Sequence, residues 1–271
     1  MNKKITEGFY PDMTDDQYFG TAELTNSDFR LLAESALHLK NKDLFSLGGG
    51  KFVFGSALHC KVLEPKEFDK RYAVESFEGS DLNKNSKAYK EAKAEWVGSV
   101  TDKEILSVDD GLKLDKMAKN VMAIAGDFLK GGEAEVAMFA DMDGVFMSGK
   151  ADSLNHNLQY IFDVKTTQSI AKFGTSAVDY NYISQSALYS DIVEKITGKQ
   201  YSFSFILVET TAPYMVSIHT ATPEMIEIGR SIYTEMIGRY KAYRDEGIVN
   251  VEKMVRLPKW FLEIQRGHSE G

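Results

Sequence analysis

The stretch Gly149–Thr167, with the sequence GKADSLNHNLQYIFDVKTT, constrains the fold of this chain more than any other. Its apolar run YIFDV predicts a strand, and side chains alternate between the faces of a strand, so Asp163 and Lys165 project to the same side. The segment Asn155–Asn157 has residues that favour a chain reversal. A hairpin closed there would bring Asp152 close to Asp163. The stretch therefore predicts two carboxylates and one ammonium on one face of a twisted sheet.

Further strands and helices are predicted around this hairpin. EVAMFAD (135–141), VFMSGKADSL (145–154) and LQYIFDVKT (158–166) form a three-stranded meander with a turn at 141–144. Two more strands are expected at 201–209 and 215–221. Apolar residues at helical spacing predict helices before, between and after the strands, over residues 28–39, 53–62, 87–97, 108–129, 175–197 and 222–245. This order predicts an α/β fold with a mixed central β-sheet and α-helices on both faces.

No linker divides the chain, so residues 1–271 are expected to form one domain. Its expected parts are an irregular N-terminal arm (1–24), a mainly helical part (25–130), the sheet with its helix (131–221), and a C-terminal helix and tail (222–271). Trp260 and Phe261 in the tail are expected to dock on the body. Gly48–Gly50 lacks the GxxxxGK[ST] spacing of a nucleotide-binding loop and is expected to be a flexible link.

The composition excludes several classes of protein. The single cysteine, Cys60, rules out an internal disulfide and a four-cysteine zinc or iron–sulfur site. No apolar run approaches the roughly 20 residues of a membrane helix, so no membrane association is expected. The N-terminal MNKKITEGFYPDM lacks the apolar core of a secretory signal. A reducing cytoplasm is the expected compartment.

The net charge of −8 argues mildly against nucleic-acid binding, because sequence-independent affinity for DNA comes from lysine and arginine on phosphates. The average hides a local excess, since residues 36–72 contain seven basic and four acidic side chains. These basic residues could form a DNA-binding face on an acidic protein. They could equally be the solvated surface of helices.

Four further side chains are candidates for a site, each with a plainer alternative. His59 lies on a predicted helix, where a lone histidine is more often packed or exposed than a ligand. Glu135 begins the first strand of the meander and either enters the same cleft as the aspartates or is an exposed strand-end carboxylate. Gln185 and Tyr189 are four residues apart on a predicted helix and so share one face.

The pattern Asp152, ten residues, then Asp163-Val164-Lys165 resembles the motif of the PD-(D/E)XK nucleases. A wider pattern is similar to RecB-type nuclease domains and phage exonucleases. In chain order it consists of GSALH, GKAD, DVKTT and QSALYSD. Four stretches of the chain resemble segments of exonuclease VIII (RecE)-like phage and prophage exonucleases, and they occur in the same order. They are MTDDQYFGTAELTNSDFRLLAESALHLK, GSALHCKVLEPKEFDKRYAV, YNYISQSALYSD and LPKW. Two departures are Ala36 and Ala151, which stand where that family has proline.

The resemblance implies a restriction-endonuclease-like core and a role for each matched residue. Lys165 is the implied catalytic lysine, and Gln185 and Tyr189 are implied to line the cleft and to steady the lysine or the DNA strand. The implied metal ligands are His59, Asp152, Asp163, the Val164 backbone carbonyl and, by a looser correspondence, Glu135.

The chemistry of phosphodiester hydrolysis suits these residue types. Mg²⁺ prefers carboxylate oxygens and water, so two aspartates neutralise its charge and leave coordination positions open. A bound metal lowers the pKa of its water and stabilises the charge of the transition state. Lys165 can orient the attacking water.

The resemblance implies a Mg²⁺-dependent exodeoxyribonuclease, with Mn²⁺ able to substitute, that degrades linear double-stranded DNA from 5′ to 3′ and leaves 3′ single-stranded tails for DNA recombination. It also implies a single-strand annealing recombinase as partner, a ring-shaped homo-oligomer (trimer or tetramer), and the cytoplasm of a bacterial host. The alternatives are a related structure-selective endonuclease or single-strand exonuclease and, from another class, a catalytically silent DNA-binding relative.

Overall fold

The computed structural model describes residues 5–11, 13–45 and 50–247. Three antiparallel strands, β5 (Glu133–Met142), β6 (Val145–Asn155) and β7 (Tyr160–Thr167), form the centre of its main sheet. β8 (Ser202–Glu209) runs parallel to β7, and β9 (Val216–Thr220) runs antiparallel to β8. The sheet is therefore mixed, as predicted from the sequence.

Shorter strands complete the sheets. β1 (Gly8–Tyr10) pairs with β5, and β2 (Leu24–Thr25) pairs with β6, which gives a seven-stranded main sheet among the described residues. β3 (Tyr72–Val74) and β4 (Glu104–Leu106) pair with each other in a separate two-stranded sheet.

Two local turns set the register of the central meander. Asp143 and Gly144 both have positive φ, 54° and 77°, as a two-residue type I′ turn between β5 and β6 requires. In the reversal between β6 and β7, Asn155 Oδ1 accepts a 3.0 Å hydrogen bond from the Leu158 N–H. The predicted meander and its asparagine-rich reversal are confirmed.

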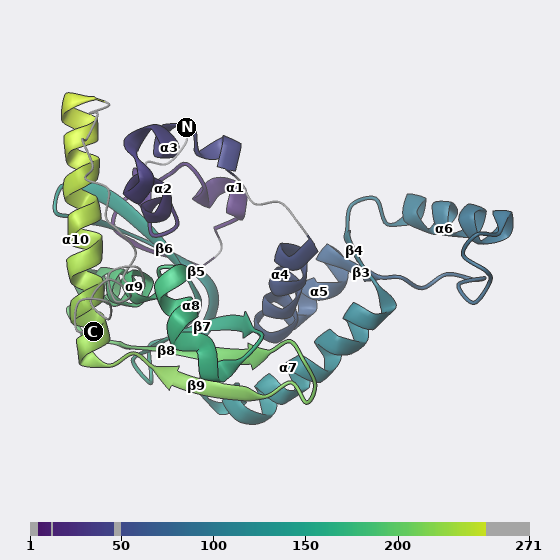
Figure 1. The fold of residues 1–271 in the computed structure, drawn as a ribbon. Helices are drawn as coiled ribbons and strands as arrows, with labels where there is room; N and C mark the ends of the chain where they lie inside the picture. The colour runs from purple at the N-terminus through teal and green to yellow at the C-terminus, as the bar shows by residue number, and fades with distance from the viewer. Residues whose placement is uncertain (1–4, 12, 46–49, 248–271) are drawn as a thin grey trace, which may run out of the picture.

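Helices cover both faces of the main sheet (Figure 1). α4 (Gly50–Leu63) and α7 (Val108–Leu129) pack on one face, while α2 (Asp28–Glu34), α9 (Tyr182–Thr197) and α10 (Pro223–Glu246) pack on the other. The remaining helices are shorter or peripheral: α1 (Asp15–Tyr18), α3 (Ala36–Lys40), η1 (Lys42–Phe45), α5 (Pro65–Arg71), α6 (Lys87–Ser99), η2 (Ile170–Lys172) and α8 (Phe173–Asp179). Among the described helices, none has both the length and the apolar character that crossing a bilayer demands.

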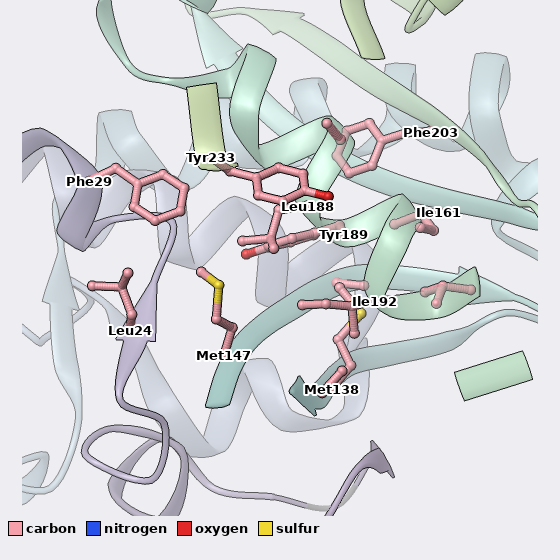
Figure 2. Close-up of a cluster of buried hydrophobic side chains, with 14 of the residues drawn as sticks. Leu24, Phe29, Met138, Met147, Ile161, Leu188, Tyr189, Ile192, Phe203 and Tyr233 are labelled. Atoms are coloured by element: carbon pink, nitrogen blue, oxygen red, sulfur yellow. The ribbon is translucent and has the colours of Figure 1, made fainter. Parts of the chain in front are cut away.

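Strand alternation divides the core into two main clusters. On β8, Phe203 and Phe205 face the α9 side, whereas Ile206 and Val208 face the α7 side. Figure 2 shows the first cluster, in which Leu188 of α9 lies among apolar side chains from the sheet and from α10. Because both faces of the central strands are buried, their positions are fixed by packing on two sides.

Two expectations for the N-terminal part of the chain are wrong in detail. The arm at 1–24 is not irregular over its described residues, because β1 extends the sheet and Tyr18 of α1 packs against Phe139. The helix expected at 28–39 is interrupted at Ser35, which is extended and whose Oγ accepts a hydrogen bond from the His38 N–H at the start of α3. Serine caps helices better than it continues them.

The helix expected at 175–197 is two helices, α8 and α9, separated at Tyr180 and Asn181. Asn181 has a left-handed conformation with φ of 58°, which asparagine tolerates better than most residues. The expected tail contacts of Trp260 and Phe261, and the glycine link at 48 and 49, lie outside the described residues.

Candidate metal-dependent active site

The hairpin of β6 and β7 places the two aspartates where its hydrogen-bonded ladder ends. The last pair of the ladder before the site is Ser153 opposite Phe162. Beyond it, Asp152 Oδ2 accepts a 2.7 Å hydrogen bond from the Val164 N–H in place of a backbone carbonyl. The N–H and C=O of one residue leave an extended strand on the same side, so the Val164 carbonyl also points towards β6. Asp152 and the Val164 carbonyl therefore face the same gap beside Asp163.

Asp163 is buried and is held from two elements. Its Oδ1 accepts a 2.8 Å hydrogen bond from Gln185 Nε2 of α9, and its Oδ2 lies 2.6 Å from Lys165 Nζ. Oδ2 is buried, and the Lys165 ammonium is its ion-pair partner. The same ammonium lies 4.8 Å from the centre of the Tyr182 ring, a cation–π contact.

The pKa shifts of this pair define what each group can do. Burial raises the pKa of Asp163 to about 6, and the nearby Asp152 carboxylate adds to the rise while Lys165 opposes it. Burial lowers the pKa of Lys165, but the charges of Asp163 and Asp152 outweigh it and hold that pKa above its ordinary value. Lys165 is therefore an ammonium at neutral pH, which makes it a cation and a hydrogen-bond donor and not a base.

His59 reaches the site from α4, on the other side of the sheet from Gln185. Its Nδ1 lies 3.4 Å from Asp152 Oδ2, and a quarter of its side chain (25%) is exposed. Burial lowers the pKa of His59, but the Asp152 carboxylate outweighs burial and raises it to about 9. For Asp152, burial raises the pKa, while His59 and Lys165 together hold it below its ordinary value. His59 thus lies within ion-pair distance of Asp152.

Glu135 lies beside Asp152 because of an unusual backbone conformation. In the register of β5 and β6, Ala134 is opposite Ser153 and Val136 is opposite Ala151, so Glu135 stands across from Asp152. Its φ of 53° is a left-handed value within a strand, which costs about 1–3 kcal/mol for a residue other than glycine. Like charges across neighbouring strands are also unfavourable. Strain and repulsion at one point are typical of a functional site.

Lys150 offsets part of this repulsion. Its Nζ lies 2.9 Å from Glu135 Oε2 and 2.8 Å from Asp15 Oδ1 of α1. Burial nevertheless raises the pKa of Glu135, with a further contribution from Asp152. The plainer alternative for Glu135, an exposed strand-end carboxylate, is wrong because the side chain is only 21% exposed and faces Asp152.

The residues present fit a divalent cation. His59, Glu135 and Asp152 each offer one ligand atom, and these atoms lie within 4.8 Å of one another. Asp163 is not in this group; its Oδ1 accepts a hydrogen bond from Gln185, and its Oδ2 pairs with Lys165. Carboxylate oxygens suit Mg²⁺ or Mn²⁺, and the single imidazole is a nitrogen ligand of the kind that transition metals favour. Glu135, which the resemblance matched only loosely, thus lies together with His59 and Asp152.

Tyr189 follows Gln185 by one turn of α9, and both side chains are buried. Burial raises the pKa of Tyr189 well above its ordinary value, so it is a neutral phenol.

Sequence reasoning missed two residues at the site, Lys150 and Tyr182. Tyr182 could have been found, since it precedes Gln185 by three residues and so lies on the same helix face. Lys150 could also have been found, since it precedes Asp152 by two residues on β6 and alternation places both side chains on one face.

We expect Gly149→Ala to destabilise the protein by about 1–3 kcal/mol through overpacking. A Cβ at Gly149 would lie 2.5 Å from Tyr189 Cε1 and 2.9 Å from Met138 Cε, and both neighbours are buried. Thermal unfolding measures the change. Gly98→Ala is the matched control, because its Cβ would meet no atom within 4 Å and a helical alanine is favoured over glycine. An equal change in both variants would contradict the packing argument.

Comparisons with known proteins agree with this geometry. The family model described as "PDDEXK-like domain of unknown function (DUF3799)" matches residues 24–249. No curated protein matches the chain. The crystal structure of a protein from Eubacterium rectale, described as a "putative exonuclease", shares the fold with a TM-score of 0.65 at 13% identity, over 94% of this chain and 99% of that one.

A second solved structure, SSO0001, has a TM-score of only 0.27 at 15% identity, over 66% of this chain and 85% of that one, and supports no argument about the fold. The family match covers most of the chain, including His59, both aspartates, Lys165 and α9. The chain therefore belongs to the PDDEXK-like family DUF3799, within the PD-(D/E)XK nuclease superfamily.

Proposed function

We propose that this protein is a Mg²⁺-dependent exodeoxyribonuclease that degrades linear double-stranded DNA from 5′ to 3′ and leaves 3′ single-stranded tails. The observation that carries the proposal is the cluster of His59, Glu135 and Asp152, within 4.8 Å, beside the ion pair of Asp163 and Lys165. The family match and the shared fold support a nuclease. The direction of digestion and the role in recombination rest on the resemblance to exonuclease VIII-like enzymes.

The proposed metal ligands are His59, Glu135, Asp152, Asp163 and the Val164 carbonyl. Mg²⁺ bound there supplies charge neutralisation of the phosphate and a lower pKa for its water. Lys165, as an ammonium, donates hydrogen bonds to the attacking water and stabilises the negative charge that develops on it. Gln185 fixes the orientation of Asp163 through a hydrogen bond, and the Tyr182 ring makes a cation–π contact with the Lys165 ammonium. The chain thus holds its charged groups in place before substrate arrives, which is the basis of electrostatic catalysis.

The proposed partners follow from the same resemblance. They are double-stranded DNA, a single-strand annealing recombinase in the bacterial cytoplasm, and further copies of this chain in a trimeric or tetrameric ring. A ring around DNA would retain the substrate despite the net charge of −8, provided that its channel is basic.

We expect the protein to degrade linear duplex DNA in Mg²⁺, to spare a closed circular duplex, and to be inactive in EDTA. Linear duplexes labelled at the 5′ or the 3′ end report the polarity, since early release of the 5′ label indicates 5′ to 3′ digestion. Cleavage of the circle at the linear rate would favour the endonuclease alternative. A protein whose melting temperature rises with Mg²⁺ or Mn²⁺, but which cleaves no DNA, would be the silent DNA-binding relative.

A further inference from the structure

A groove of about 680 Å³ lies next to the proposed catalytic lysine, where β7 and β8 end. Thr166 and Thr167, which follow Lys165 on β7, form part of its wall together with Thr210 just after β8. Lys113, Lys172, Tyr180 and Tyr182 also line the groove. Because the Tyr182 ring also lies 4.8 Å from Lys165 Nζ, the groove leads directly to the proposed catalytic centre.

A row of aromatic rings runs along the groove and ends at the surface. The Tyr182 ring stacks on Phe173 at 5.8 Å and 17°, and the Tyr180 ring lies 5.8 Å from Tyr182 on the outer side. Tyr180 is 65% exposed. The left-handed Asn181 between the two tyrosines is held in place, since its carbonyl accepts hydrogen bonds from Asn26 Nδ2 and Ser184 Oγ. The backbone next to Tyr180 is therefore held in place, while most of the Tyr180 side chain is exposed.

Two lysines in the groove have no ion-pair partner among the residues that the structure describes. These are Lys113 of α7 and Lys172 of η2, which are both exposed. By contrast, four of the basic residues in the span 36–72 are already in ion pairs: Lys42, Lys61, Lys70 and Arg71. Asp110 also lines the groove, where it accepts a hydrogen bond from Ser107 Oγ. The groove thus offers two unpaired cations beside the proposed catalytic lysine.

We propose that this groove binds a single DNA strand next to the phosphate at the catalytic centre, with Tyr180 stacked on an unpaired base and Lys113 and Lys172 on neighbouring phosphates. An aromatic platform combined with a cationic wall is the usual means of binding single strands without sequence preference. A base inside a duplex is already stacked on its neighbours, so its face is not available to Tyr180. The inference rests on the proposed nuclease function and adds that the DNA next to the catalytic centre is bound as a single strand with an unpaired base.

The test is binding of a fluorescein-labelled single-stranded oligonucleotide of mixed sequence, followed by anisotropy in EDTA at several salt concentrations. We expect Tyr180→Ala to weaken binding by about 5-fold to 100-fold and Tyr180→Phe to bind as the unaltered protein does, because phenylalanine keeps the stacking face. Lys172→Ala should reduce the slope of log K against log salt by about 0.7, while Tyr180→Ala leaves the slope unchanged. Lys199→Ala is the matched control, because Lys199 precedes β8 at the opposite end of the strand from the groove.

The outcomes separate this inference from the proposed function. If the protein degrades DNA in Mg²⁺ but Tyr180→Ala and Lys172→Ala bind the oligonucleotide normally, the groove proposal is wrong and the nuclease proposal stands. If both variants lose affinity as described but the protein cleaves no DNA, the groove binds a strand and the nuclease proposal fails. Equal loss in Lys199→Ala would show general electrostatic attraction and would also overturn the groove proposal.

Discussion

Asp163→Asn is expected to lower the rate of Mg²⁺-dependent DNA degradation by more than about 10³-fold, a larger loss than removal of one preorganised donor causes. The variant removes a negative charge from the proposed metal site and leaves Lys165 without its nearest counter-ion. The fold should survive, because Gln185 can still donate to the amide oxygen and asparagine has nearly the same shape. Release of acid-soluble nucleotides from linear duplex measures the rate, and thermal unfolding measures the fold.

The matched control for this variant is Asp143→Asn. Asp143 lies in the turn between β5 and β6, nine residues from Asp152 along β6, and its left-handed backbone accepts asparagine readily. It should degrade DNA at the original rate. In addition, Mg²⁺ should raise the melting temperature of Asp143→Asn and have a smaller effect on Asp163→Asn, because binding to the native state stabilises it. Full activity of purified Asp163→Asn would overturn the proposed site.

Lys165→Met is expected to lower the maximal rate by about 10²–10³-fold, equivalent to about 2.7–4 kcal/mol of transition-state stabilisation. Methionine keeps an unbranched apolar side chain of similar length and removes the charge, the hydrogen-bond donors and the cation–π contact with Tyr182. The proposed ligands all remain, so Mg²⁺ should still raise the melting temperature. Initial rates at saturating DNA, measured beside a Mg²⁺ titration of thermal stability, test both statements.

Lys241→Met is the control for the loss of a lysine. Lys241 of α10 pairs with Asp143, far along the β5–β6 hairpin from the site, and the variant should retain full activity. If Lys165→Met instead abolished the response to Mg²⁺, the lysine would act by organising the ligands, and its assignment to the attacking water would be wrong. The two main variants therefore distinguish metal binding from the chemical step.

The fold could be predicted largely from the sequence because its signals are local. The apolar run YIFDV predicts a strand, and alternation along it places Asp163 and Lys165 on one face. Asp143 and Gly144 are residue types that adopt the left-handed conformation of the tight turn between β5 and β6. The wrong predictions concern two helices, each of which is interrupted at a single residue. Asn181 and Ser35 interrupt helices whose apolar spacing is otherwise continuous, and periodicity over a whole window does not detect a single left-handed or extended residue.

The sequence by itself determined the meander, the DxK face and most, but not all, of the side chains from which the site is built. Only the tertiary structure decided which of them touch. Gln185 binds Asp163 from α9, His59 approaches Asp152 from α4 on the opposite face, and neither contact follows from spacing because the partners are 22 and 93 residues apart. The proximity of Glu135 to Asp152 likewise depends on strand register and on a left-handed backbone that the surrounding sheet holds in place. Packing of two helical layers on one sheet supplies the energy that brings these charges together, and that energy is a property of the whole fold.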